Sequence, residues 1–292
     1  MVTNTTKEHR YPPWVQVRLF VETQPWRPFL LRKVIVPLRK LLLRTQLIKY
    51  FFYDPMHNQS AYILLVPKKV SMIPYVIDKL NSILHSNRWK KCVQTKELGP
   101  FCARTTTTLG GNRAASIIAE FNHWGSLACL KFEKLYTNTS LATRFLFATL
   151  CTSKVLDSFE LTTYQSARLL SNWVNHAATE HKINKNRIDR LANQMYRSLH
   201  KNLLTYVKKD SLSSQNMPPS YSRIIQDFAQ NILIPGKKIS PLREAKHRVQ
   251  PLWEILGRRI IHPHWLRLGI NLSYELVLEK TLSKIRKSGE VL

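Results

Sequence analysis

The spacing of hydrophobic residues changes part-way along this 292-residue chain. Up to about residue 138, stretches that alternate with period two, as strands do, are interleaved with stretches of helical period. After residue 139 the alternating pattern fades and helical spacings remain. We therefore predict an α+β fold with a sheet-containing half over residues 1–138 and a helical half over residues 139–292, the two halves closing over one active-site cavity.

The first half has the element order of a split β-α-β-β-α unit. Its expected strands cover residues 14–20, 49–53 and 60–66. Its expected helices cover residues 25–46, where Pro37 predicts a kink or two successive helices, and residues 71–85. A fourth strand is expected within residues 91–96 or 126–134, and the threonine-rich stretch 105–112 is expected to be a loop.

The second half contains stretches of helical spacing separated by proline and glycine. Helices are expected at residues 141–156, 164–179, 187–208, 221–232, 242–261 and 274–287. Pro218–Pro219 and the segment from Ile234 to Pro241 are expected to separate them.

The charge balance indicates what the protein binds. The chain has 45 Lys and Arg against 18 Asp and Glu, which gives a net charge of +27. Because 44% of its residues are hydrophobic, it is not a disordered basic tail. The expected partner is an anionic chain, either an acidic peptide or a nucleic acid.

Part of this charge lies on one face of the predicted helix 25–46. Such a stripe is often only a solvated helix face, but here no acidic residue occurs between Thr23 and Lys49. The uncompensated charge favours a polyanion-binding surface, which we call the basic stripe: Arg32, Lys33, Arg39, Lys40 and Arg44.

Several other classes of protein leave no signal in the sequence. The four cysteines are widely separated, so we expect buried, reduced thiols and no zinc or redox site. We find no secretory signal and no apolar span of membrane length, and expect a cytoplasmic protein. Nucleic-acid binding stays open as an alternative, although the sequence contains no motif of the known nucleic-acid-binding domains.

The segment from Ile260 to Ile270 concentrates polar side chains that can carry chemistry. His262 and His264 precede Arg267, and this combination can move protons beside a bound carbonyl or carboxylate. No third ligand completes a metal site. The alternative is a pair of surface histidines in a loop before the last helix.

This segment resembles the closing motif of the elimination domains of class I lanthipeptide dehydratases and of small stand-alone thiopeptide proteins. That motif runs roughly His-Met-x-x-Asn-Arg-Leu-x-Gly, and His262 and Arg267 match its His and Arg. Residues 50–57 resemble the family's Phe-Phe-Ile-Arg-Tyr-x-Asp-Pro-x-x-His segment, and residues 132–136 resemble Glu-x-x-Arg-Tyr-Gly-Gly. The matches keep the family's order over nearly the whole chain, which implies the fold of these elimination domains.

Departures from the motifs bear on the reaction. In the family, arginines of the Arg-Tyr and His-x-Arg-x-Arg segments serve glutamate elimination, but here Phe52 runs directly to Tyr53 and residues 58–65 contain no arginine. The carboxylate clamp is therefore expected to be missing. The resemblance then implies the micrococcin-type thiopeptide pyridine synthases, which join two dehydroalanines by a formal [4+2] aza-cycloaddition, with dehydration and leader elimination closing the macrocycle.

Two alternatives stay open at this point. Within the family, the protein would eliminate glutamate from glutamylated Ser or Thr to give dehydroamino acids. Outside it, the protein would be a non-catalytic, basic nucleic-acid-binding protein.

The resemblance also implies roles for single residues. His262 and Tyr136 would move protons, with Glu133 orienting them. Substrate would be bound by Arg267, His264, Trp265 and Trp14. The basic stripe would bind an acidic leader peptide, and other enzymes of the pathway are further expected partners. No cofactor or metal ion is implied.

Overall fold

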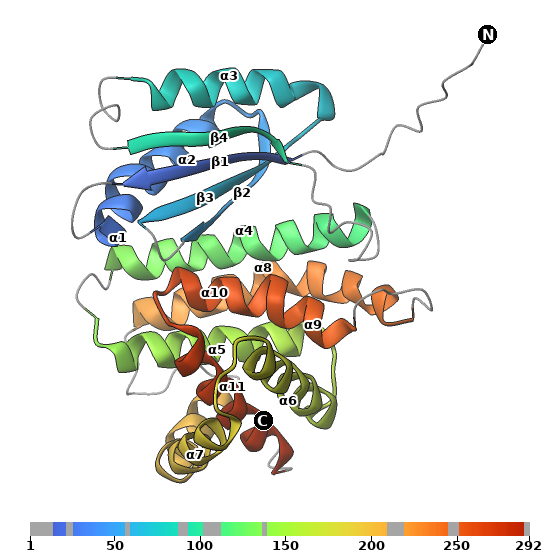
Figure 1. Ribbon diagram of the computed structural model, residues 1–292. Coiled ribbons are helices and arrows are strands. Elements are labelled where there is room, and N and C mark those ends of the chain that lie inside the picture. The colour runs from blue at the N-terminus through green and yellow to red at the C-terminus, as the bar shows by residue number, and fades with distance from the viewer. Residues whose placement is uncertain are drawn as a thin grey trace.

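A four-stranded antiparallel sheet forms one end of the molecule (Figure 1). Its strands are β1 (Trp14–Val21), β2 (Ile48–Pro55), β3 (Ser60–Pro67) and β4 (Val93–Phe101), in the order β2-β3-β1-β4. This computed structural model describes residues 14–21, 26–55, 59–86, 93–101, 112–135, 139–208, 219–244 and 251–288. The strand–helix–strand–strand–helix order that the sequence predicted is confirmed, and β4 begins within the first of the two ranges expected for it.

One face of the sheet is covered by two helical elements. The first runs through α1 (Trp26–Phe29), the π-helical stretch η1 (Leu30–Ile35) and α2 (Val36–Arg44). The second is the 3₁₀ turn η2 (Val70–Met72) followed by α3 (Ile73–Leu84). Alternate strand residues such as Val17 and Ile63 pack against them. The irregularity expected at Pro37 takes the form of the wider π-helical turn directly before it.

The other face of the sheet packs on α4 (Asn112–Leu135). Trp14, Phe52 and Leu64 contact Ala115 and Ala119, whose small side chains let the helix approach the strands closely. The alternative expectation of a strand within residues 126–134 is wrong, because this stretch is the last part of α4. The loop expected at residues 105–112 lies mostly outside the described residues.

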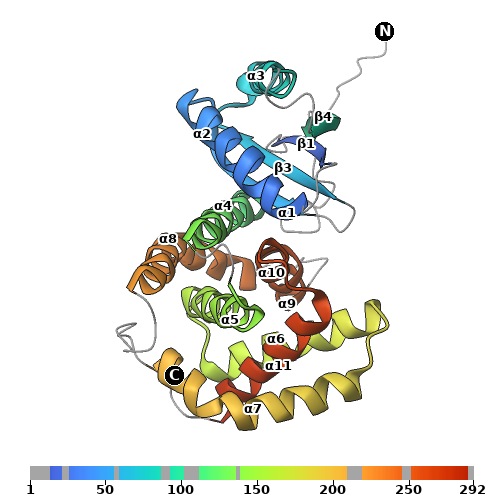
Figure 2. The ribbon, with the colours of Figure 1, turned by 90° about the vertical axis from the view of Figure 1, so that its left-hand side faces the viewer.

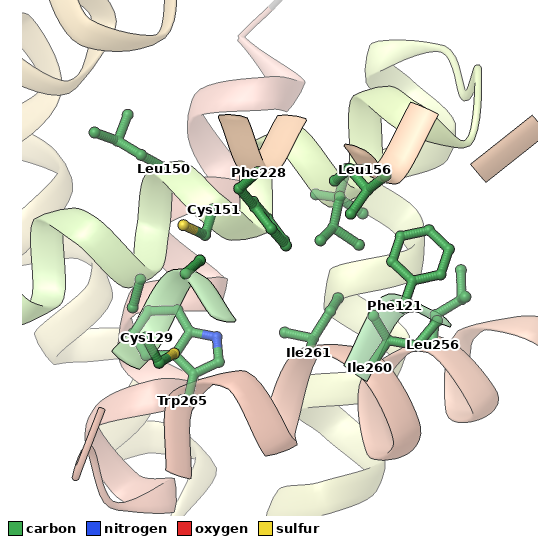
Figure 3. Close-up of a cluster of buried hydrophobic side chains, with 14 of the residues drawn as sticks. Phe121, Cys129, Leu150, Cys151, Leu156, Phe228, Leu256, Ile260, Ile261 and Trp265 are labelled. Carbon is green, nitrogen blue, oxygen red and sulfur yellow. The ribbon is translucent and has the colours of Figure 1, made fainter. Parts of the chain in front are cut away.

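The remaining helices stack beneath α4 (Figures 1 and 2). They are α5 (Leu141–Ser158), α6 (Thr163–Glu180), α7 (Lys185–Lys208), α8 (Pro219–Glu244), α9 (Leu252–Leu256), the π-helical η3 (Gly257–Ile261), α10 (His262–Arg267) and α11 (Leu272–Lys287). Figure 3 shows part of their shared core, including Cys129, Cys151 and Trp265. Both of these cysteines are free thiols, as expected, and Cys92 and Cys102 lie outside the described residues.

One expectation about a break in this half is wrong, and so is the alternative that the two histidines lie in a loop. Helix α8 continues through Pro235 and Gly236, where a break was expected, because the buried side chains Ile232 and Ile239 hold this stretch in the core. Gly236 packs so closely on α5 that a Cβ would lie 2.2 Å from the Ser158 carbonyl oxygen. The segment with the two histidines is helical, in α10, and is not a loop. Among the described residues, no helix is long and apolar enough to cross a membrane.

Candidate active site

The site begins at the free edge of β2, the outermost strand on one side of the sheet. Side chains from two helices bind the main-chain groups of this edge. Ser126 Oγ accepts from the Tyr53 amide at 3.3 Å, and His123 Nδ1 lies 3.2 Å from the Phe51 amide nitrogen. Arg267 Nε donates to the Tyr53 carbonyl at 2.7 Å. These contacts tie the main-chain groups of Phe51 and Tyr53 to side chains of α4 and α10, and so hold β2 against both helices.

Arg267 is the centre of this junction. Its side chain is 1% exposed, and its Nη2 donates to Asp54 Oδ1 at 2.5 Å and to Asn122 Oδ1 at 2.7 Å. The expectation that it binds a carbonyl of the substrate is corrected by this geometry. The carbonyl it binds belongs to β2 of its own chain, and the side chain has no surface left for a ligand.

A cavity of about 340 Å³ lies beside this junction, between the α1–η1 helix, the end of α4 and the start of α5. Part of its wall is aliphatic, formed by Leu31, Val36 and Leu130. Its charged lining consists of one carboxylate and four cationic side chains: Glu133, Arg27, Arg32, Lys134 and Arg144. Residues from both halves of the chain therefore line it.

Glu133, expected to be catalytic, lies in this wall between two guanidinium groups. Arg27 Nη2 donates to its Oε1 at 3.0 Å, and Arg144 donates to both carboxylate oxygens, with Nη2 3.2 Å from Oε2. The same guanidinium groups also donate to the carbonyls of Arg267 and Leu268. This charged cluster therefore fixes the C-terminal end of α10.

Sequence reasoning missed both arginines of this cluster. Arg27 and Arg144 are separated from Glu133 by 106 and 11 positions, and neither falls in a segment that matches the family's motifs. Only the fold brings them to the cavity. Two arginines thus lie in the site even though those of the usual motif positions are absent.

His262 lies at the start of α10 and is not among the residues that line the cavity. Its Nδ1 is 2.6 Å from Glu275 Oε2, and its side chain is 23% exposed while Glu275 is fully buried. Burial lowers the pKa of His262 to about 4, and the charge of Arg258 adds to this effect while that of Asp54 opposes it. The imidazole is therefore neutral at physiological pH, and Asp54 links it electrostatically to the Arg267 junction.

Three further residues expected to bind substrate belong to the core. Trp265 has no exposed surface, and His264 is 4% exposed and stacks on Phe228 with ring centroids 5.6 Å apart. Trp14 is 6% exposed and meets Phe52 edge to face. Because a substrate has no access to these side chains, we reassign them to packing. Tyr136 lies outside the described residues, so its role stays a prediction.

The basic stripe lies on the outer side of the η1–α2 helix. Arg32, Lys33, Lys40 and Arg44 are exposed, and burial of the partly covered Arg39 lowers its pKa. Within the described part of the chain, none of the five is paired with a carboxylate. Their positive charge is therefore free to act on a ligand.

Residues 14–285 match the family model of the lantibiotic biosynthesis dehydratase C-terminal region. The chain belongs to this family. Its members act on ribosomally made precursor peptides, so the family supports a peptide substrate. A comparison with curated proteins finds no match.

Solved structures with the same fold include three proteins of low sequence identity. The tRNA-dependent lantibiotic dehydratase MibB from Microbispora sp. 107891 aligns with a TM-score of 0.63 and 12% identity, over 94% of this chain and 28% of MibB. TsrL aligns with a TM-score of 0.54 and 12% identity, over 94% of this chain and 95% of TsrL. TbtD, a pyridine synthase from thiomuracin biosynthesis, aligns with a TM-score of 0.59 and 11% identity, over 95% of this chain and 98% of TbtD. These likenesses establish the elimination-domain fold that the motifs implied.

Proposed function

We propose that this protein is a thiopeptide pyridine synthase. It takes a precursor peptide with thiazoles and two dehydroalanines, joins the dehydroalanines in a formal [4+2] aza-cycloaddition, and releases water and the leader peptide as its carboxamide. Membership of the family and the fold shared with TbtD support this proposal. The observation that carries it is the state of His262.

His262 is a neutral, weak base, because burial lowers its pKa to about 4. A base this weak is poorly matched to removing a Cα proton, the step that glutamate elimination requires. The tautomerisation of an amide to its iminol asks less of the base. It needs one nitrogen that moves one proton in each step: from the amide nitrogen to its oxygen, then from the new ring to the departing hydroxyl, and last from the ring to the departing leader amide.

In this proposal the cavity binds a part of the precursor beside the reacting dehydroalanines, since His262 is not among the residues that line it. Its aliphatic wall suits thiazole and dehydroalanine groups, and Arg27 and Arg144 have their guanidinium planes fixed by Glu133. Fixed N–H donors can hold amide carbonyls of that part of the precursor in one orientation. In this proposal Glu133 orients the arginines. The role of Tyr136 as a second proton-transfer residue beside His262 stays a prediction.

Incubation of the purified protein with a synthetic bis-dehydroalanine precursor tests the proposal. We expect the precursor mass to be replaced by those of the macrocycle and the leader carboxamide, with new pyridine absorbance. His262→Phe is expected to lose this activity, and His181→Phe, at an exposed position, serves as the matched control. An unchanged precursor with folded wild-type protein would refute the proposal.

A second candidate function, glutamate elimination, is favoured by the charge of the cavity. Its lining carries four cations against the single carboxylate of Glu133, and Arg32 and Lys134 have no acidic partner among the described residues. Such an excess suits a glutamate leaving group. A glutamylated precursor that loses glutamate in the presence of the protein would establish this function in place of the first.

We also propose that the basic stripe binds an acidic leader peptide. Most of its cationic side chains are exposed, and none is paired with a carboxylate among the described residues. The stripe runs from Arg32 at the cavity along α2. Affinity for a fluorescein-labelled acidic leader is expected to fall as salt is raised and after Lys40→Glu, but not after the control Lys182→Glu on the α6–α7 turn. Salt-independent leader binding, or tighter binding of RNA of random sequence, would refute this assignment.

A further inference from the structure

A row of four aromatic rings leads away from His262, along the contact between α6 and the helix formed by α9, η3 and α10. The ring centroid of Trp173 on α6 lies 6.4 Å from that of His262 and 6.3 Å from that of His176. The His176 ring in turn meets Trp253 of α9 edge to face, with ring centroids 5.1 Å apart. We call these four residues the ring row: His262, Trp173, His176 and Trp253.

Close packing and polar contacts fix the ring row in place. Trp173 is buried, and it lies so close to η3 that a Cβ on Gly257 would be 2.2 Å from its ring. Arg258 of η3 donates to Glu180 Oε2 on α6 at 2.5 Å, and its Nη2 lies 3.3 Å from His176 Nε2. These contacts tie α6 to η3, so the rings keep their spacing.

Three of the four rings have surface that a ligand can reach. The side chains of His262 and His176 are 23% and 36% exposed, and Trp253 is half-buried. The Nδ1 side of His262 faces inward, because Nδ1 lies 2.6 Å from Glu275, which is fully buried, as is Glu279 on the same helix. A ligand therefore meets the opposite side of the imidazole, and the exposed rings of His176 and Trp253 follow along the row.

The charges at this end of the row are balanced, in contrast to those of the cationic cavity. The charged groups that act on His262 are the carboxylate of Asp54 and the guanidinium of Arg258. Each already forms an ion pair, Asp54 with Arg267 and Arg258 with Glu180. Because the two charges offset each other, this end of the row suits an uncharged ring better than a carboxylate.

We propose that the ring row is the subsite for a thiazole of the precursor, which stacks on His176 and Trp253 and so holds the neighbouring dehydroalanine at His262. Aromatic rings attract one another at centroid distances of about 4.5–7 Å, and a thiazole is a flat, uncharged ring that suits such a surface. That the ring is a thiazole rests on the proposed function. The ring row lies at the start of α10 and the cavity at its C-terminal end, so one precursor can contact both.

Calorimetric titration with two unreactive precursors tests the proposal without any turnover. Both carry the same leader and Ser in place of the dehydroalanines, and the second also has Ala in place of every thiazole. We expect wild-type protein to bind the thiazole precursor at least about tenfold more tightly than the Ala precursor. Trp253→Leu and His176→Leu keep an apolar side chain but remove a flat ring, and each should reduce this preference about fivefold or more. The control Tyr164→Ala removes an exposed ring of α6 outside the row and should leave the preference unchanged.

Equal binding of the two precursors by wild-type protein, or a thiazole preference that survives loss of either ring, would overturn the proposal. Because the His176 side chain is well exposed, His176→Leu keeps the test decisive even if Trp253→Leu does not fold. If the preference depends on the ring row but wild-type protein makes no pyridine from the reactive precursor, the proposed function fails and the ring-binding subsite stands. If pyridine forms while the preference is independent of both rings, the subsite is wrong and the proposed function stands.

Discussion

Replacing Arg267 with methionine tests how the site is held to the sheet. The substitution removes the hydrogen bonds to the Tyr53 carbonyl, Asp54 and Asn122 while keeping a long side chain. Two of these acceptors are buried, and each costs about 1–3 kcal/mol when left without a donor. Asp54 is 31% exposed and regains water, so its share is under about 1 kcal/mol. Methionine avoids the cost of burying a charged guanidinium, which offsets part of this sum. We therefore expect the free energy of unfolding to fall by about 3–5 kcal/mol.

Urea unfolding followed by circular dichroism measures this loss, and the Tm should fall by about 6–15 °C. The matched control is Lys131→Met, which breaks an ion pair of 2.8 Å to Asp227 whose partners are 43% and 42% exposed. That change should cost less than about 1 kcal/mol, because water replaces the exposed pair. If Arg267→Met proved no more destabilising than Lys131→Met, Arg267 would not be the anchor of α10.

Three further changes test other parts of the structure. Gly257→Ala places a Cβ 2.2 Å from the Trp173 ring, so we expect a loss of about 1–3 kcal/mol in thermal unfolding; unaltered stability would mean that this packing is wrong. Burial raises the pKa of Glu279 above its unfolded value, so its contribution to stability is present below about pH 4.5 and is lost as the pH rises. The free energy of unfolding of Glu279→Gln, measured relative to that of wild type, should therefore grow by about 1.4 kcal/mol per pH unit above pH 4.5. If the two proteins showed the same change of unfolding free energy with pH, this reasoning would be contradicted. Because the pKa of His262 is lowered to about 4, turnover should stay level from pH 8 to pH 6, whereas a fall centred near pH 6.5 would show an ordinary histidine.

The sheet could be predicted from the sequence because its strands have one clear period. β1 was expected at residues 14–20 and is Trp14–Val21, and β3 was expected at 60–66 and is Ser60–Pro67. In both strands alternate side chains are buried on the face that packs against α1–α3. Flanking prolines and polar turn residues set the ends, so local chemistry and burial agree.

The course of the helices was less predictable, because tertiary packing overrides local propensity. Pro235 and Gly236 read locally as a break, but α8 continues through them since its apolar face is buried on α4 and α5. Residues 126–134 contain the short apolar run Leu127–Leu130, which by itself fits a buried strand as well as a helix, and only the length of α4 shows that it is helical.

In the site, too, single residues could be found from local motifs, whereas contacts between residues far apart in the sequence could not. His262 could be found from its motif, and Glu275 and Glu279 were visible on the helix that follows, but the contact of His262 with Glu275 and the full burial of both glutamates were not. Arg27 and Arg144 reach Glu133 only through the packing of α1 and α5 on the end of α4. The spacing of residues within one segment does not reveal such contacts, so the cationic cavity could not be predicted from the sequence.

One mass spectrum tests the proposed function most directly. Purified protein is incubated with equal amounts of a bis-dehydroalanine precursor and a glutamylated precursor that share one leader sequence. We predict that the first is converted to macrocycle and leader carboxamide while the mass of the second is unchanged. Loss of glutamate from the second, with the first left intact, would contradict a pyridine synthase and assign the cationic cavity to elimination.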